Sequence, residues 1–129
     1  GLFQTAGARH RGAARVVASD LVQSALDRAQ AMGADVLHKA GSAPPPDAGD
    51  YDVVFECSGS PRGVATAIEA ARKGGILVQV GFLADQIVPV PFNMVLAKEL
   101  DVRGSFRFAD VYRQAVSWPR TARAAPRWC

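Results

Sequence analysis

The sequence has few cysteines and no long apolar run. Its two cysteines are Cys57 and Cys129, and no Cys-x-x-Cys or Cys/His pair has the spacing of a zinc finger. The longest mostly apolar stretches, residues 75–84 and 87–97, fall short of the roughly 18 apolar residues of a membrane span. These absences argue against a disulfide scaffold and a zinc finger. They predict a cytoplasmic protein with no membrane segment and no secretory leader.

The body of the chain also lacks a basic excess. Residues 1–110 hold eleven Lys/Arg against twelve Asp/Glu, whereas residues 111–129 hold four arginines and no acid. The net charge of +3 therefore comes from the tail alone. A nucleic-acid-binding protein is expected to carry basic residues on a folded face, interleaved with aromatic residues. We therefore predict no nucleic-acid partner.

Short apolar runs alternate with helical patterns along the 129 residues. The predicted strands cover residues 14–19, 34–39, 52–57, 76–80 and 102–106, and the predicted helices cover residues 2–11, 21–32, 63–73 and 93–100. Ser60 is the expected N-cap of the third helix, with Pro61 at its first position and Gly74 and Gly75 at its end. Strands that alternate with helices over short connections predict an α/β fold with a parallel sheet and flanking helices.

One glycine and one aspartate match the spacing of a dinucleotide-binding fingerprint. In such a domain a Gly-rich turn lets a pyrophosphate approach a helix N-terminus, and an acid about 20 positions later accepts the ribose hydroxyls. Gly1 stands 19 positions before Asp20, which follows the first predicted strand. The alternative is that Asp20 caps the following helix.

Four segments carry a more specific pattern, namely DVVFECSGSP (52–61), KGGILVQVGF (73–82), VPVPFNMVLAKEL (88–100) and RGSFRF (103–108). In order and spacing they resemble the nucleotide-binding half of the zinc-dependent medium-chain dehydrogenases, and most of all the polyol and sugar-acid branch. The resemblance covers residues 1–116 and implies a partial NAD-binding domain of the Rossmann type, whose first strand is missing. It implies NAD as the cofactor, a polyol or sugar acid as the substrate of the parent enzyme, and a parent enzyme that is a homo-oligomer.

The same resemblance assigns cofactor contacts to individual residues. Asp20 resembles the acid that binds the adenosine ribose, and its charge would repel a 2′-phosphate, which favours NAD over NADP. The other expected cofactor-binding residues are Gly1 at the pyrophosphate turn, Cys57, Ser58 and Gly59 beneath the cofactor, Val80, Gly81 and Phe82 near the nicotinamide, and Gly104, Ser105 and Phe106 beside the carboxamide. The structural alternative makes Gly59 and Gly81 ordinary turn glycines. It makes Cys57 and Phe106 core residues.

No zinc ligand is expected in this chain. His10 and His38 are isolated, and neither has a Cys or Glu at the spacing of a metal site. The resemblance implies that zinc and the catalytic acid and base belong to an N-terminal domain of the intact parent enzyme. We therefore assign no catalytic and no metal-binding residue, and we expect the chain to be inactive by itself.

Residues 117–129 depart from the family. From Trp118 they read WPRTARAAPRWC, where Pro119 breaks the expected helix and ten of twelve residues are Ala, Arg, Pro or Trp. We interpret this tail as disordered or as out-of-frame translation, and a genuine basic tail is the alternative.

Two other functions stay open. One is an S-adenosylmethionine-dependent methyltransferase, which also uses a Gly-rich turn and a ribose-binding acid. The other is a non-catalytic remnant or interaction module, in which the VPVPF segment (88–92) pairs with a strand of another chain.

Overall fold

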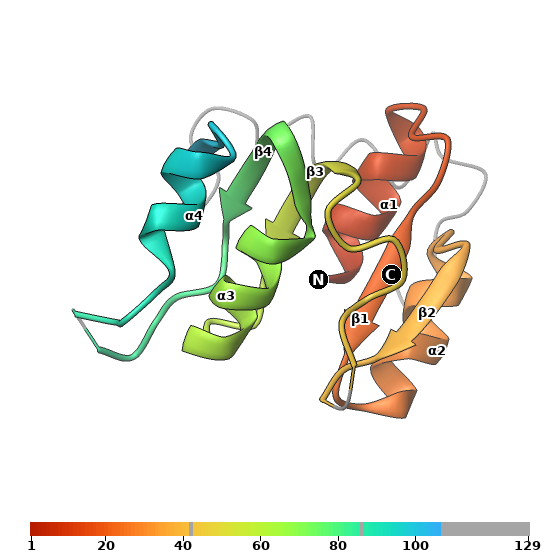
Figure 1. Ribbon diagram of the computed structural model, residues 1–129. Helices are drawn as coiled ribbons and strands as arrows, with labels where there is room; N and C mark the ends of the chain where they lie inside the picture. Colours follow the sequence, from red (N-terminus) through yellow and green to blue (C-terminus); the bar gives the residue numbers. More distant parts are fainter. Residues whose placement is uncertain (42, 86, 107–129) are drawn as a thin grey trace. The chain divides into compact units, whose positions relative to one another are not determined.

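The computed structural model describes residues 1–41, 43–85 and 87–106, which fall into two compact units (Figure 1). The first unit contains Gly1–Gly41 together with Phe106. The second unit contains the described residues between positions 43 and 105. The expected tail at 117–129 lies outside the described residues. Among the helices that are described, none is both long and apolar enough to span a membrane.

The first unit is a two-stranded parallel sheet with helices. Its elements are α1 (Leu2–His10), β1 (Val17–Asp20), α2 (Gln23–Ala31) and β2 (Val36–Lys39). The strands pair in parallel, with Val17 opposite Val36 and Asp20 opposite Lys39. Helix α2 contacts both strands and buries Leu26 (Figure 1).

One arginine anchors α1 within this unit. Arg9 donates from Nε to the Gly33 carbonyl at 3.1 Å and from Nη1 to the Ala13 carbonyl at 2.9 Å. Its Nη2 group also pairs with the Asp35 carboxylate. Asp35 Oδ2 accepts the Val16 N–H at 2.7 Å. That backbone bond, and after it the Arg9 guanidinium, lowers the pKa of Asp35 below its ordinary value.

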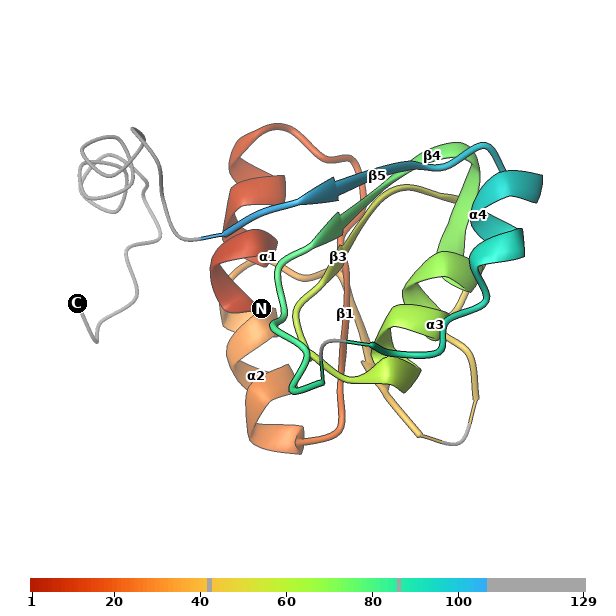
Figure 2. The same cartoon turned by 90° about the vertical axis from the view of Figure 1, so that its left-hand side faces the viewer.

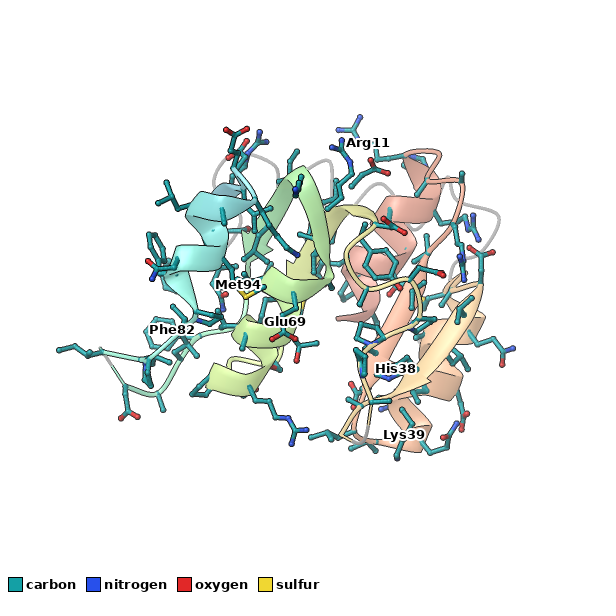
Figure 3. The ribbon with its side chains drawn as sticks, in the orientation of Figure 1. Arg11, His38, Lys39, Glu69, Phe82 and Met94 are labelled. Atoms are coloured by element: carbon teal, nitrogen blue, oxygen red, sulfur yellow. The ribbon has the colours of Figure 1, made fainter. Side chains whose placement is uncertain are left out.

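The second unit is a three-stranded parallel sheet in the order β3-β4-β5. Its elements are β3 (Tyr51–Glu56), α3 (Pro61–Ala70), β4 (Ala71–Gln79), α4 (Phe92–Ala97) and β5 (Asp101–Gly104). Helices α3 and α4 cover the same face of the sheet (Figure 2). Their core is centred on Ile68 of α3 and Leu77 of β4, with Met94 of α4 packed against it (Figure 3). The predicted parallel α/β fold is confirmed, with all five strands present.

The junction between α3 and β4 differs from the prediction. The helix ends at Ala70 instead of residue 73, and Gly74 and Gly75 belong to β4. The strand register shifts there, because Tyr51 pairs with Ala71 whereas Val53 pairs with Ile76. The glycines therefore form an irregularity in the strand, as glycines within strands often do, instead of terminating the helix.

Candidate functional site

Most of the predicted cofactor residues of the second unit follow the carboxyl ends of its strands. Residues 57–59 follow β3, residues 80–82 follow β4, and Ser105 follows β5. The Ser105 N–H donates to the Gln79 carbonyl at 2.9 Å, so the ends of β4 and β5 are bonded to each other. In open parallel α/β sheets this edge is where ligands bind.

Two glycines allow the turn at residues 57–59 and the turn at residues 80–82 to make backbone contact. Gly59 has a φ of +65°, and a Cβ added there would strike the Phe82 carbonyl oxygen. A Cβ added to Gly81 would strike the Gly59 nitrogen and lie 2.8 Å from the Gly59 Cα. The positive φ of Gly59 fits a turn glycine. Position 81 needs a glycine because the backbone of Gly59 approaches it so closely. Side chains are excluded from both turns at this point.

A buried carboxylate lies beneath these turns, and the sequence analysis did not include it among the site residues. Glu56, the last residue of β3, is only 4% exposed. Its Oε1 accepts the Ser58 N–H at 2.7 Å and the Ser58 hydroxyl. Its Oε2 accepts the Gln79 side-chain amide at 2.7 Å and the Gly59 N–H at 3.2 Å. The available signal was a charged residue inside the apolar run DVVFEC and a glutamine inside ILVQV.

The remaining predicted residues differ in exposure. Cys57 and Val80 are half-buried, whereas Ser58 and Gly104 are exposed. Phe82 is 82% exposed in the segment between β4 and α4 (Figure 3). Phe106 is 70% exposed, so the alternative that makes it a core residue is wrong.

Asp20 and Gly1 belong to the first unit. Asp20 ends β1, and its Oδ1 accepts the Val22 N–H at 2.8 Å. The N-cap of α2 is Val22, whose side chain makes no capping bond, and Asp20 lies two residues before it. The alternative that Asp20 is the cap of this helix is therefore wrong. Gly1 is the N-cap of α1, and a Cβ there would meet nothing within 4 Å. That Asp20 and the turns of the second unit bind the same cofactor stays a prediction.

Metal-ligating side chains do not gather in the part of the chain that the structure describes. Within residues 1–41, 43–85 and 87–106, no group of three or more His, Cys, Asp or Glu could hold a metal ion. His38 Nδ1 lies 2.9 Å from the Ser19 hydroxyl, and His10 is the last residue of α1. Neither histidine belongs to such a group, and the close contact between the turns of Gly59 and Gly81 leaves no room for a side chain between them.

Comparison with known proteins identifies relatives over most of the chain. L-idonate 5-dehydrogenase (NAD(P)(+)) of Escherichia coli K12 is 38% identical over 111 residues, which cover 83% of this chain and 32% of that protein. Sorbitol dehydrogenase of sheep, Ovis aries, is 31% identical over 126 residues, which cover 91% of this chain and 35% of that protein. The chain spans about a third of the length of these curated relatives.

Solved structures agree with these relatives. The crystal structure of E. coli L-idonate 5-dehydrogenase has a TM-score of 0.83 and 35% identity, covering 91% of this chain and 35% of that chain. A structure described as a zinc-binding dehydrogenase from Sinorhizobium meliloti 1021, bound to NADP, has a TM-score of 0.79 and 30% identity, covering 90% of this chain and 37% of that chain. The predicted Rossmann-type fold is thereby confirmed.

Residues 1–120 match the protein family described as zinc-binding dehydrogenase. The match includes all four segments on which the resemblance was based, and it covers 120 of the 129 residues. The chain belongs to the zinc-binding dehydrogenase family.

Proposed function

We propose that this chain is the nucleotide-binding part of a dehydrogenase that oxidises a polyol or sugar acid with NAD. The observation that carries the proposal is the backbone contact between the turns of Gly59 and Gly81, in a chain 38% identical to an NAD(P)-dependent L-idonate dehydrogenase. The proposed domain covers residues 1–116. Family membership favours this function over the methyltransferase and over the interaction module.

The proposal assigns a separate cofactor contact to each group of predicted residues. The Asp20 carboxylate accepts the hydroxyls of the adenosine ribose, and Gly1 lies at the helix end that faces the pyrophosphate. Residues 57–59, 80–82 and 104–106 hold the nicotinamide half through their backbone. Bound NAD supplies the acceptor for a hydride, whereas this chain supplies binding and orientation.

The remaining parts belong to the intact parent enzyme. Zinc, the substrate contacts and the homo-oligomer contacts are proposed for that enzyme, which we place in the cytoplasm. The isolated chain should show no dehydrogenase activity with NAD, zinc and L-idonate or sorbitol, because the described residues hold no metal site. Zinc-dependent NADH formation by the purified chain, above a mock preparation, would overturn this part of the proposal.

Cofactor binding is testable by titration of the chain with NADH, monitored by nicotinamide fluorescence. We expect saturable binding of NADH and of ADP-ribose, and none of S-adenosylmethionine. Binding of S-adenosylmethionine without NADH would instead support the methyltransferase.

Asp20 provides a specific check on this titration. Asp20→Ala should weaken NADH binding by about tenfold or more, because hydrogen bonds to a charged acceptor are lost, and it should reduce the preference for NADH over NADPH. The matched control is Asp27→Ala, which removes an exposed aspartate on α2. Equal effects of the two substitutions would refute the role of Asp20.

A further inference from the structure

A single side chain connects the two glycine turns of the second unit. Both oxygens of the buried Glu56 carboxylate accept hydrogen bonds, from Ser58 and Gly59 of one turn and from Gln79 at the start of the other. The Glu56 carbonyl accepts the Val80 and Gly81 N–H groups, both at 2.9 Å. One residue at the end of β3 is therefore bonded to both turns.

The partners of this carboxylate act as hydrogen-bond donors. The Ser58 and Gly59 backbone amides, the Ser58 hydroxyl and the Gln79 amide nitrogen all point hydrogens at its two oxygens. Burying a carboxylate is unfavourable unless its oxygens accept such bonds. A glutamine in its place has only one oxygen, so its NH₂ group would face a backbone N–H donor, that of Ser58 or that of Gly59, whichever way the amide is turned.

The space around the carboxylate is also restricted. A Cβ on Gly81 would lie 2.7 Å from Glu56 Oε2, and a Cβ on Gly63 of α3 would lie 2.7 Å from Oε1. The carboxylate thus occupies the room that these two glycines leave. Gln79 completes the link, because its amide nitrogen also donates to the Gly81 carbonyl at 2.7 Å.

We propose that Glu56 is a positioning residue that locks the turns of residues 57–60 and 80–82 together, and so orients the nicotinamide half of the cofactor. This inference rests on the proposed function, which assigns those turns to the nicotinamide and Asp20 to the adenosine ribose. Glu56 is buried beneath the turns, so the proposal gives it no direct contact with the cofactor. Its loss should therefore affect the nicotinamide half and leave the adenosine half bound.

The test compares two ligands on the full chain. ADP-ribose contains the adenosine half and lacks the nicotinamide, whereas NADH contains both. Glu56→Gln should weaken NADH binding about tenfold and leave ADP-ribose binding within about twofold, since a lost charged hydrogen bond corresponds to roughly that change. The matched control, Glu69→Gln on the exposed side of α3, should change neither (Figure 3).

Amide hydrogen exchange provides a readout that needs no cofactor. In Glu56→Gln the amides of Ser58, Gly59, Val80 and Gly81 should exchange at least about tenfold faster, while the amides of α3 keep their protection. A second variant, Gln79→Met, keeps the volume and removes one donor, and it should shift the same amides and the same ligand ratio by a smaller factor. It decides the question if Glu56→Gln does not fold.

The outcomes separate the two proposals. Selective loss of NADH affinity with faster exchange at the turns supports the positioning role. Equal weakening of NADH and ADP-ribose, or unchanged exchange at Gly59 and Gly81, overturns it. Failure of the unsubstituted chain to bind NADH overturns the proposed function and the cofactor role of Glu56 together, while the exchange data still decide whether Glu56 locks the turns.

Discussion

Replacement of Lys98 by methionine should destabilise the second unit by removing a cap on α3. The Lys98 ammonium donates to the carbonyls of Ala71 at 2.8 Å, Glu69 at 2.7 Å and Ile68 at 3.1 Å. Helix α3 passes directly into β4, so these carbonyls lie at a helix end that has no turn to satisfy them. The positive charge of Lys98 also interacts favourably with the partial negative charge of that helix end.

The magnitude follows from which of these bonds are shielded from water. The bonds to Ile68 and Ala71 are partly buried, whereas the bond to Glu69 is exposed and contributes little. Two partly buried bonds to a charged donor predict a loss of about 3 kcal/mol in the free energy of unfolding. Methionine keeps an unbranched stem of similar length, so the loss reflects the ammonium group and not the packing of the stem.

The assay is urea unfolding followed by circular dichroism. With a slope of roughly 1 to 3 kcal/mol per molar urea, Lys98→Met should lower the midpoint by about 1 to 3 M. Lys73→Met is the matched control, because Lys73 is exposed in the irregular part of β4 and should shift the midpoint little. A midpoint for Lys98→Met equal to that of Lys73→Met would refute the capping role.

Four further substitutions test the packing and the pH dependence by thermal or urea unfolding. Gly81→Ala should cost about 3 kcal/mol because its methyl group meets the backbone of Gly59, whereas Gly104→Ala, with nothing within 4 Å of the added Cβ, should cost little. Gly7→Ala inside α1 should stabilise the protein by about 0.5 to 1 kcal/mol, since its added Cβ also meets nothing within 4 Å; a destabilised variant would contradict the helix. The pKa of Asp35 is lowered from 3.8 on folding, so its stabilisation is complete above that value and is lost as the pH falls through the folded pKa. The Tm difference between the unsubstituted chain and Asp35→Asn should therefore shrink in acid, and a difference independent of pH would count against the Asp35 contacts.

The strands and the start of α3 could be predicted because their causes are local. Apolar runs separated by helical patterns give the parallel strands, and the Ser60 hydroxyl accepts the Gly63 N–H at 3.0 Å, as expected of an N-cap before Pro61. The end of α3 could not be predicted in this way. It depends on Lys98, which is 27 to 30 positions away from the carbonyls that it caps.

The sequence predicted the two glycine turns of the candidate site, but not the Glu56 network that joins them. Gly59 and Gly81 were expected at turns. Only the folded backbone shows that a side chain at either position would collide with the backbone of the other turn. Glu56 is unusual in the sequence only as a charge inside an apolar run, and its partner Gln79 reaches it only after β3 and β4 have paired in parallel. A buried polar network of this kind depends on tertiary contacts that no local pattern encodes.

The most direct test of the account is an NMR titration of the ¹⁵N-labelled chain with NADH. We predict that the largest amide shifts fall at Asp20 and its neighbours and at the turns of Gly59, Gly81 and Ser105. ADP-ribose should reproduce the shifts at Asp20 and leave those at Gly81 small. Shifts scattered over other residues, or none at a saturating concentration of NADH, would contradict the proposal that this chain binds the cofactor.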